Sequence, residues 1–535
     1  MIDLSRSLDA KIVRHASVYP THRKPDVPNR LFMGVFDQEG SLVDGSLLDR
    51  RSGEVGAPVE IRQLPDPVDA PSPAGIYCGV LYYHFGHFLV ESMARLWYAA
   101  RYPDLPLIWA GASNWAPQAL LKGWQQEILR LLGIRNPVII VTTPSRFQEL
   151  HVPEVGYRYD DQFHPEHARF LGGYEGPSQV AGSRLWLSRS RISSDVRDLN
   201  ALTLERRISE VGWRVIYPES MSIQEQLDSL AQAEVIAGEE GSAFHLLMLL
   251  KDVTNKRCRI IRRLGNEHRN MHTVGDAIGL TQSFHTLENE AVVAARGRYV
   301  TKISANASEI LDILEVPIVR GRGGSTEAPL DSCRRFVGEV LSVIKPDTYL
   351  ELGVDDPSII AGSEVPVRRT ISANFSFDPR VYRDTGVEFY ELPVPQYFAG
   401  YGDSARYDLI RVGTCSADET FGLVCASMVN SHGSTVWLLD DVMSAAGGKA
   451  WLGVLRLLDA FPSLLAHTVV CEDSSQTLLW QEPRGRYVPV APQGGDGGSF
   501  ETLSNEAREA LAIVTEERAP TVLAGLAGFL RSKAG

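Results

Sequence analysis

The sequence lacks the closely spaced cysteines that zinc sites and disulfide-bonded domains require. Its six cysteines lie far apart, at positions 78, 258, 333, 415, 425 and 471, and no CxxC pair occurs. The pattern therefore indicates neither a structural metal site nor a disulfide framework. Scattered thiols suit a reducing compartment, so we expect a cytoplasmic protein.

Long apolar runs and an excess of basic charge are missing too. No stretch reaches the roughly 18 apolar residues that a membrane-spanning helix needs. The first residues, MIDLSRSLDAKIVRHAS, do not contain the apolar core of a signal peptide. The net charge of −13 argues against a general nucleic-acid binder. We expect no transmembrane segment and no nucleic-acid partner, and we leave contact with the periphery of the inner membrane open.

What remains is an ordinary globular composition over a long chain. Of the 535 residues, 44% are hydrophobic and 22% are charged, which is typical of globular domains. This length predicts about two to four domains. Residues 1–75 are rich in Pro, Asp and Gly with brief apolar runs, and they predict short strands and loops.

The stretch 233–250 organises the rest of the chain. It reads AEVIAG, EEGS and AFHLLMLL, which predicts a buried strand, a glycine-bounded turn and an apolar helix. Gly238 and Gly241 enclose two carboxylates, and Ser242 is expected to cap the helix. Such a turn presents N–H groups to a phosphate at the positive end of the helix dipole. The alternative is a plain turn in which the glycines serve only the backbone.

A second informative stretch, 76–98, reads IYCGVLYYHFGHFLVESMARLWY. Its apolar residues recur at helical spacing and predict a buried helix face. His84, His87, Glu91 and Arg95 follow at steps of three and four, so they share an adjacent face. That face either supplies a base or a sugar-hydroxyl contact in a cleft, or forms an ion pair of Glu91 with Arg95 and His87 on the helix surface. A metal site at the two histidines is not indicated, because no carboxylate or cysteine follows at the spacing of a metal ligand.

Two longer segments alternate between strand and helix. Residues 105–145 and 184–262 both show the βαβ pattern that indicates a parallel sheet. The strand RLWLSRS runs into Arg189 and Arg191 at its carboxyl end, where α/β sheets bind ligands. Guanidinium groups suit diphosphate oxygens, and the alternative is a solvated basic loop. His245 either faces the same site or is a buried core histidine.

These motifs together resemble glycosyltransferase family 61 over about residues 75–290. Members share a helix with a His, an acid and Arg-Leu, matched here by His87, Glu91 and Arg95 in HFLVESMARL. A helix of the form S-x-x-x-Q then precedes a Gly-rich turn, as SIQEQ precedes AEVIAGEEGSAFHLLML. Where the family commonly has a His before the second glycine of the turn, this chain has Glu240.

The family also shares a strand that ends in one or two arginines and is followed by an asparagine. Arg189, Arg191 and Asn200 match this pattern. His245 departs from it, because the family often carries a small polar residue or Asn at that helix position.

The resemblance implies a GT-B arrangement of two Rossmann-like lobes, at 1–175 and 176–318. The second lobe would bind a nucleotide sugar, and transfer would invert the anomeric centre without an essential metal. Glu91 is the favoured general base and His87 would orient it or the acceptor hydroxyl, while Arg95 and Asn200 would support the site. The expected donor-binding residues come from the strand end and the turn: Arg189, Arg191, Glu240, Gly241, Ser242 and His245.

Beyond residue 290 the pattern changes. VRGRGGSTEAPLD, at 319–331, predicts a linker. Residues 331–485 predict one Rossmann-like domain with strands in YLELGV, ISANFSFDP, YDLIRVG and STVWLLDDV, and with HTVVCED and TLLWQEP as a closing antiparallel pair. Residues 486–535 predict a helical tail. The strand order of 331–485 resembles that of class I S-adenosylmethionine-dependent methyltransferases.

The cofactor loop departs from that family. Its acid-x-Gly-x-Gly-x-Gly pattern is represented here by Glu351, Gly353, Asp355 and Pro357, and Asp378 matches the acid that holds the ribose. A side chain and a proline in place of two glycines obstruct close approach of the backbone to a ligand. We therefore expect no useful binding of S-adenosylmethionine, and a domain that supports the transferase lobes or an assembly contact.

The sequence thus predicts an α/β protein with two Rossmann-like lobes and a third, methyltransferase-like domain. The leading function is an inverting glycosyltransferase that uses a nucleotide sugar and a glycan or lipid-linked acceptor, in bacterial surface polysaccharide or related glycan assembly. Two alternatives stay open: a bifunctional glycosyl- and methyltransferase, and a non-catalytic assembly protein that keeps the fold.

Overall fold

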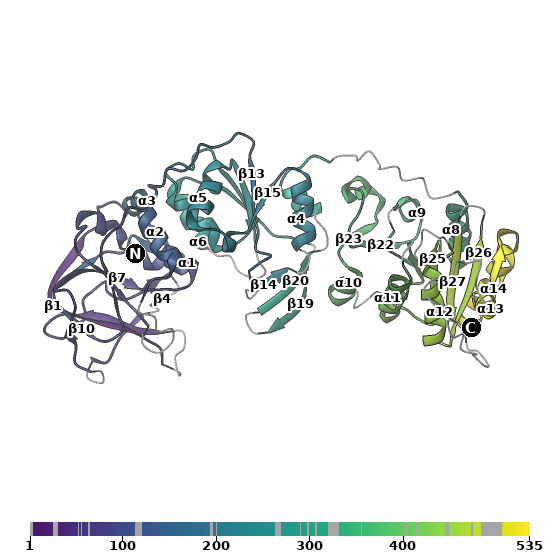
Figure 1. Cartoon of the computed structure of the whole chain (residues 1–535), viewed down its shortest axis with the longest axis horizontal. Coiled ribbons are helices and arrows are strands. Elements are labelled where there is room, and N and C mark those ends of the chain that lie inside the picture. Colours follow the sequence, from purple (N-terminus) through teal and green to yellow (C-terminus); the bar gives the residue numbers. More distant parts are fainter. Residues whose placement is uncertain are drawn as a thin grey trace. The chain divides into compact units, whose positions relative to one another are not determined.

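In the computed structural model the chain divides into two compact units. Figure 1 shows the helices and strands, coloured along the sequence. Unit 1 comprises Met1–Arg191 and Gly212–Thr286, and unit 2 comprises Ile192–Val211 and Leu287–Gly535. The described residues are 4–24, 30–51, 53–54, 56–61, 65–112, 120–192, 196–198, 201–262, 269–288, 290–296, 299–304, 308–318, 331–354, 356–401, 405–413, 416–443, 449–471, 474–482 and 505–534. The predicted linker at 319–331 lies outside them except for its last residue.

The first half of unit 1 is built on a mixed sheet. Its strand order is β5 (Gly56–Pro58), β2 (Leu31–Phe36), β1 (Ala10–His22), β10 (Ser145–Pro153), β7 (Ala74–Val80), β8 (Leu107–Ala110) and β9 (Val138–Val141). The predicted βαβ unit is confirmed, because β8 and β9 are parallel and α2 (Gly123–Leu131) connects them. The expectation of only short strands before residue 75 is wrong, since β1 has 13 residues.

The second half of unit 1 is a fully parallel sheet. The strand order is β15 (Arg214–Ile216), β13 (Arg184–Leu187), β16 (Val235–Glu239), β17 (Arg257–Ile261) and β18 (Thr281–His285). Helix α5 (Ile223–Gln232) begins with the predicted capping box, in which Ser222 and Glu225 bond each other's backbone N–H groups. The predicted doubly wound pattern is confirmed for this half.

One hydrophobic core joins the two halves of unit 1. Phe88 and Met93 from the first half pack in the same cluster as Leu246 and Leu247 from the second. Helix α2 packs against α5, and the turns after β7 pack against the helix after β16. The strand ends of both halves are therefore held in fixed relation by buried apolar contacts.

Unit 2 contains an eight-stranded sheet. Its order is β23 (Glu388–Glu391), β22 (Val367–Ser372), β21 (Thr348–Leu352), β24 (Leu409–Val412), β25 (Val436–Asp440), β27 (Ser475–Gln481), β26 (Leu464–Val470) and β28 (Ile513–Thr515). The strands from β23 to β25 are parallel, and β27 is antiparallel to both of its neighbours. The predicted Rossmann-like order and closing antiparallel pair are confirmed.

Helices cover both faces of this sheet, over two separate cores. They are α8 (Asp331–Ile344), α9 (Ser358–Ala361), α10 (Val394–Gly400), α11 (Ala417–Ser427), α12 (Ala450–Ala460), α13 (Asn505–Ala510) and α14 (Ala519–Ala534). The C-terminal helices belong to this body, because α14 packs against α8 and β28 extends the sheet. The predicted strand that ends in an acid at 378 stops at Ser372 instead, where the serine hydroxyl accepts from Asn374 N and the chain turns.

Unit 2 also includes segments that the sequence assigned to the donor lobe. A three-stranded sheet is formed by β14 (Val196–Asp198), β20 (Tyr299–Ser304) and β19 (Glu290–Arg296). Helices α4 (Ala201–Glu210) and α7 (Ser308–Ile313) lie in the same unit. Among the described residues, no helix is both long and apolar enough to span a membrane.

Candidate functional site

The segment after β7 forms three unlike turns instead of one regular helix. It runs through α1 (Phe85–His87), the π-helical turn η2 (Phe88–Ser92) and the 3-10 helix η3 (Leu96–Arg101). Met93 N donates to the Phe88 carbonyl, which widens the helix by one residue. Turns of this kind recur at functional sites. The expectation that four polar residues share one helical face is therefore wrong beyond Ser92.

Arg95 shows the effect of the wide turn. It is buried, and it donates to the carbonyl oxygens of Pro153 and Gly45. Its guanidinium also lies over the ring of Tyr77. Arg95 therefore supports the backbone behind the site, and the predicted surface pair between Arg95 and Glu91 is replaced by a different partner.

That partner is Arg50, which binds the Glu91 carboxylate with two hydrogen bonds. Arg50 Nε lies 2.6 Å from Oε1 and Nη2 lies 2.7 Å from Oε2. His87 Nδ1 lies 2.6 Å from the same Oε2. Only 3% of the Glu91 side chain is exposed. Burial alone would raise the pKa of Glu91, but the hydrogen bonds from His87 and Arg50 outweigh it and lower that pKa.

The contacts from Arg50 through Glu91 to His87 form a hydrogen-bonded relay. His87 is its partly exposed end. Its side chain is 30% exposed, and its ring lies among those of Tyr82, Tyr159 and His84, with centroids 5.0, 5.6 and 5.1 Å away. Because the carboxylate of Glu91 accepts from Nδ1–H, the neutral ring leaves Nε2 unprotonated. The arrangement is that of a histidine oriented by a buried carboxylate.

The glycine-bounded turn lies directly against this segment. The helix after β16 is the 3-10 helix η5 (Ser242–Leu249), and its N-cap is Gly241. The expected cap by the Ser242 hydroxyl is wrong, because Ser242 is already the first helical residue. The hydroxyl instead faces Gly86, where a Cβ would lie only 2.6 Å from Oγ. A side chain at position 86 would require the Ser242 side chain to move.

Arg189 lies at the same turn, as its position after β13 predicted. A Cβ on Gly241 would lie 2.5 Å from Arg189 Nη1, so the guanidinium packs against the backbone of the turn. Arg191 is exposed and lies over the ring of Tyr217, 3.6 Å from its centroid. The two arginines of the motif therefore have different surroundings at one sheet edge.

Glu240 and its surroundings connect the turn to the Glu91 relay. Glu240 is buried, and its N–H donates to the Ile261 carbonyl, 2.8 Å away. Burial first, and then the carboxylates of Asp160, Glu91 and Glu240, raise the pKa of Tyr159 to about 12. Tyr159 is therefore a neutral phenol whose pKa is raised by the charges of both Glu91 and Glu240.

His245 lies behind the turn, inside the protein. It is buried, and its Nε2 lies 2.9 Å from the amide nitrogen of Asn270 on α6 (Arg269–Ile278). This is the core position that the sequence had left open. Asn200, the remaining predicted site residue, lies outside the described residues. Within the part of the chain that is described, no three His, Cys, Asp or Glu side chains form a cluster suited to a metal ion.

The sequence missed Arg50, Tyr159 and Asn270. Arg50 lies 41 positions before Glu91, in a segment without helical or strand periodicity. A buried acid needs a cationic partner, and this requirement was the signal that could have indicated an arginine at Glu91. Arg95 is closer to Glu91 in sequence than Arg50, so the local pattern favoured the wrong arginine.

In the eight-stranded sheet of unit 2, the described residues expected at the cofactor loop contact groups of the same chain. Glu351 is fully buried, and its Oε1 accepts from the Tyr349 hydroxyl and from Arg411 Nη1, both at 2.8 Å. A Cβ on Gly413 would lie 2.3 Å from the Gly353 carbonyl oxygen. The ends of β21 and β24 thus close on each other where doubly wound sheets bind ligands.

Two further acids of the expected cofactor site, Asp378 and Asp356, form hydrogen bonds with neighbouring residues of the same chain. Asp378 accepts from Arg380 Nε and Nη2, at 3.1 and 2.8 Å. The helix after β21, α9, has only four residues. Asp355 lies outside the described residues, and Asp356 accepts from Ser358 N at 2.8 Å.

We predict that Arg50 is required for the stability of unit 1. Arg50→Met leaves the Glu91 carboxylate buried beside His87 alone, which should cost roughly 3 kcal/mol. Hydrogen exchange of residues 85–99 under increasing urea measures this loss. Arg51→Met, at an exposed neighbour, is the matched control, and Arg50→Met with Glu91→Met should recover a large part. Equal stability of the Arg50 and Arg51 variants would contradict the assignment.

Among the comparisons with known proteins, a family model agrees with the motifs. No curated protein matches the sequence. Solved structures with partial likeness include the plantazolicin methyltransferase BpumL, 6% identical over 28% of this chain and 85% of that chain, with a TM-score of 0.23. Another is cofactor-bound Rv0187 from MTB, 15% identical over 33% of this chain and 99% of that chain, with a TM-score of 0.25. A family model described as Glycosyltransferase 61 matches residues 85–272. The predicted resemblance is thus confirmed: residues 85–272 match glycosyltransferase family 61.

Proposed function

We propose that unit 1 transfers a sugar from a nucleotide sugar to a hydroxyl group of a glycan, with inversion at the anomeric carbon. The observation that carries this proposal is the relay from Arg50 through Glu91 to His87, beside a turn that bears Arg189. The family match over residues 85–272, which include His87, Glu91 and Arg189, supports a glycosyltransferase. The relay suits proton abstraction, and the turn suits a departing diphosphate.

His87 is the better candidate for the general base. Glu91 is buried, ionised and bonded on both oxygens, so it is a poor acceptor for a further proton. His87 Nε2 would take the proton from the acceptor hydroxyl, while Glu91 stabilises the resulting imidazolium. This reverses the preference for Glu91 that the sequence had suggested.

The remaining groups would serve the donor. As the acceptor oxygen bonds to the anomeric carbon, the bond from that carbon to the diphosphate breaks, and the electron pair leaves with the nucleoside diphosphate. Arg189 and the N–H groups at the start of η5 would stabilise its charge. Arg191 on Tyr217 offers a surface for another part of the donor. These cationic groups would do so without a metal ion, in a single displacement that inverts the configuration.

The proposed setting is glycan assembly in the bacterial cytoplasm or at the inner membrane surface. We favour the bifunctional alternative less, because Glu351 and Asp378 are hydrogen-bonded to arginines of the same chain and Gly413 packs against Gly353. We propose that unit 2 does not bind S-adenosylmethionine usefully. A non-catalytic protein would not need a histidine oriented by a buried carboxylate, so the Arg50–Glu91–His87 relay favours the enzyme over the assembly protein.

A ligand panel separates the three alternatives. We expect the melting temperature of the full chain to rise with one of UDP-, GDP-, CMP- or dTDP-linked sugars, and to stay unchanged with S-adenosylmethionine. A rise with S-adenosylmethionine would support the bifunctional enzyme. No rise with any nucleotide sugar or nucleoside diphosphate would support the assembly protein.

Two substitutions then separate the base from its orienting acid. His87→Ala should lower kcat by roughly 100-fold or more, and added imidazole should restore part of the activity. Glu91→Gln should lower kcat less and should not respond to imidazole. His15→Asn, at an exposed position of β1, is the control and should act as wild type. An active His87→Ala with an inactive Glu91→Gln would instead make Glu91 the base.

A further inference from the structure

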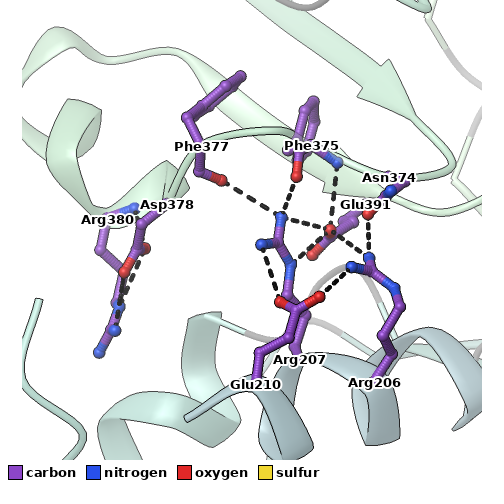
Figure 2. A network of polar contacts seen from close by, with 9 residues as sticks. All are labelled: Arg206, Arg207, Glu210, Asn374, Phe375, Phe377, Asp378, Arg380 and Glu391. Carbon is purple, nitrogen blue, oxygen red and sulfur yellow. Dashed lines mark hydrogen bonds and ion pairs between the residues drawn. The ribbon is translucent and has the colours of Figure 1, made fainter. Parts of the chain in front are cut away.

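Two arginines of α4 bind a buried glutamate at the end of β23 (Figure 2). Arg207 Nε lies 2.8 Å and Nη2 lies 2.7 Å from Glu391 Oε1. Arg206 Nη2 lies 3.6 Å from the same oxygen. Glu391 is only 1% exposed, so this carboxylate depends on the two arginines for its neutralisation.

The arginines also bind the backbone that follows β22. Arg207 donates to the carbonyl oxygens of Phe375 and Phe377, and Arg206 donates to the side chain of Asn374 (Figure 2). Phe375 N donates to Glu391 Oε1 at 3.2 Å, so loop, strand end and helix share one acceptor. The contact is a built network and not a single surface pair.

The same loop holds a second helix of the segment that precedes the methyltransferase-like sheet. Arg380 Nη1 donates to the Val316 carbonyl at 2.8 Å, and it lies 3.3 Å from Asp312 on α7. Arg383 also pairs with Asp312. We call residues 373–387, between β22 and β23, the clamp loop, because α4 and α7 are both bound to it.

The clamp loop occupies the place of a cofactor-binding loop. It follows the second strand of the doubly wound sheet, and Asp378 within it was expected to hold a ribose. That carboxylate is instead bonded to Arg380, the residue that reaches α7. A loop that could have served a nucleotide is thus built to hold helices of the same chain.

Helix α4, which the clamp loop binds, is covalently connected to the candidate transferase site. Helix α4 lies between β13 and β15, which are neighbouring strands of the donor sheet. Arg189 and Arg191 come directly before the segment 192–211 that is part of unit 2. Whatever holds α4 therefore limits the freedom of the chain on which these arginines lie.

We infer that Arg207 and Glu391 are positioning residues for the donor-binding loop, and that the C-terminal domain acts as an internal anchor and not as a second enzyme. The anchor fixes α4, and the covalent connection from α4 to β13 sets the order of residues 188–192. The functional part of this inference rests on the proposed nucleotide-sugar site, whereas the ordering of the loop does not.

Hydrogen exchange of the full-length protein without ligand tests the anchor. Glu391→Gln keeps the shape but removes the charge, and it should speed exchange in residues 201–210 and 188–192 by roughly tenfold or more. Arg207→Lys should have a smaller effect in the same two segments. Glu388→Gln is the matched control, because Glu388 lies on the same strand and pairs with Arg369 at 2.6 Å within the sheet; both segments should exchange as in wild type.

Two results would overturn the inference. Unchanged exchange in 201–210 would show that the network does not hold α4, and faster exchange in 201–210 alone would show that α4 does not order the arginine loop. With a transferable donor in hand, Glu391→Gln should raise the donor KM several-fold with kcat little changed. If no donor is ever found, the exchange result still decides the anchor, so its failure is distinct from failure of the proposed function.

Discussion

A buried carboxylate governs the architecture of the candidate site. Glu91 is almost fully enclosed, yet the hydrogen bonds of Arg50 and His87 lower its pKa and keep it ionised. An isolated charge in such surroundings would be strongly destabilising, so the pair must be formed in the folded state. Arg50 therefore ties a segment near residue 50 to the turn after β7, and His87 is oriented as a consequence.

The second constraint is steric. Gly86 lies against the Ser242 hydroxyl and Gly241 against the Arg189 guanidinium, and a Cβ at either glycine would lie only 2.6 or 2.5 Å from those side-chain atoms. These close approaches bring the relay and the donor-side turn to the same place in unit 1. Catalysis of glycosyl transfer needs a base and a stabilised leaving group within one substrate's reach, and the two glycines make that proximity sterically allowed.

Much of the fold could be predicted because it depends on local signals. Apolar strands such as VIAGE on β16, and the capping box at Ser222, encode a parallel sheet and its helices within a few residues of chain. The motifs also predicted candidate site residues, including His87, Glu91 and Arg189. Local patterns could not give Arg50, because its partner is distant in sequence, or the π-helical turn, because tertiary packing decides it.

The same limit applied to α4. Its periodicity predicted a helix correctly, but the sequence assigned it to the donor lobe by order alone. Its arginines find their acid at Glu391, on the far side of the linker in sequence. Long-range charge pairs of this kind leave no periodic trace, since one residue on each side suffices.

We propose that the turn at Gly241 and Arg189 receives the diphosphate of a nucleotide sugar beside His87. A crystal structure of the full chain with UDP or GDP, whichever stabilises it, tests this directly. We expect the diphosphate within hydrogen-bonding distance of Arg189 and the first N–H groups of η5, with His87 Nε2 facing the vacant sugar position. A diphosphate bound away from both Arg189 and His87 would contradict it.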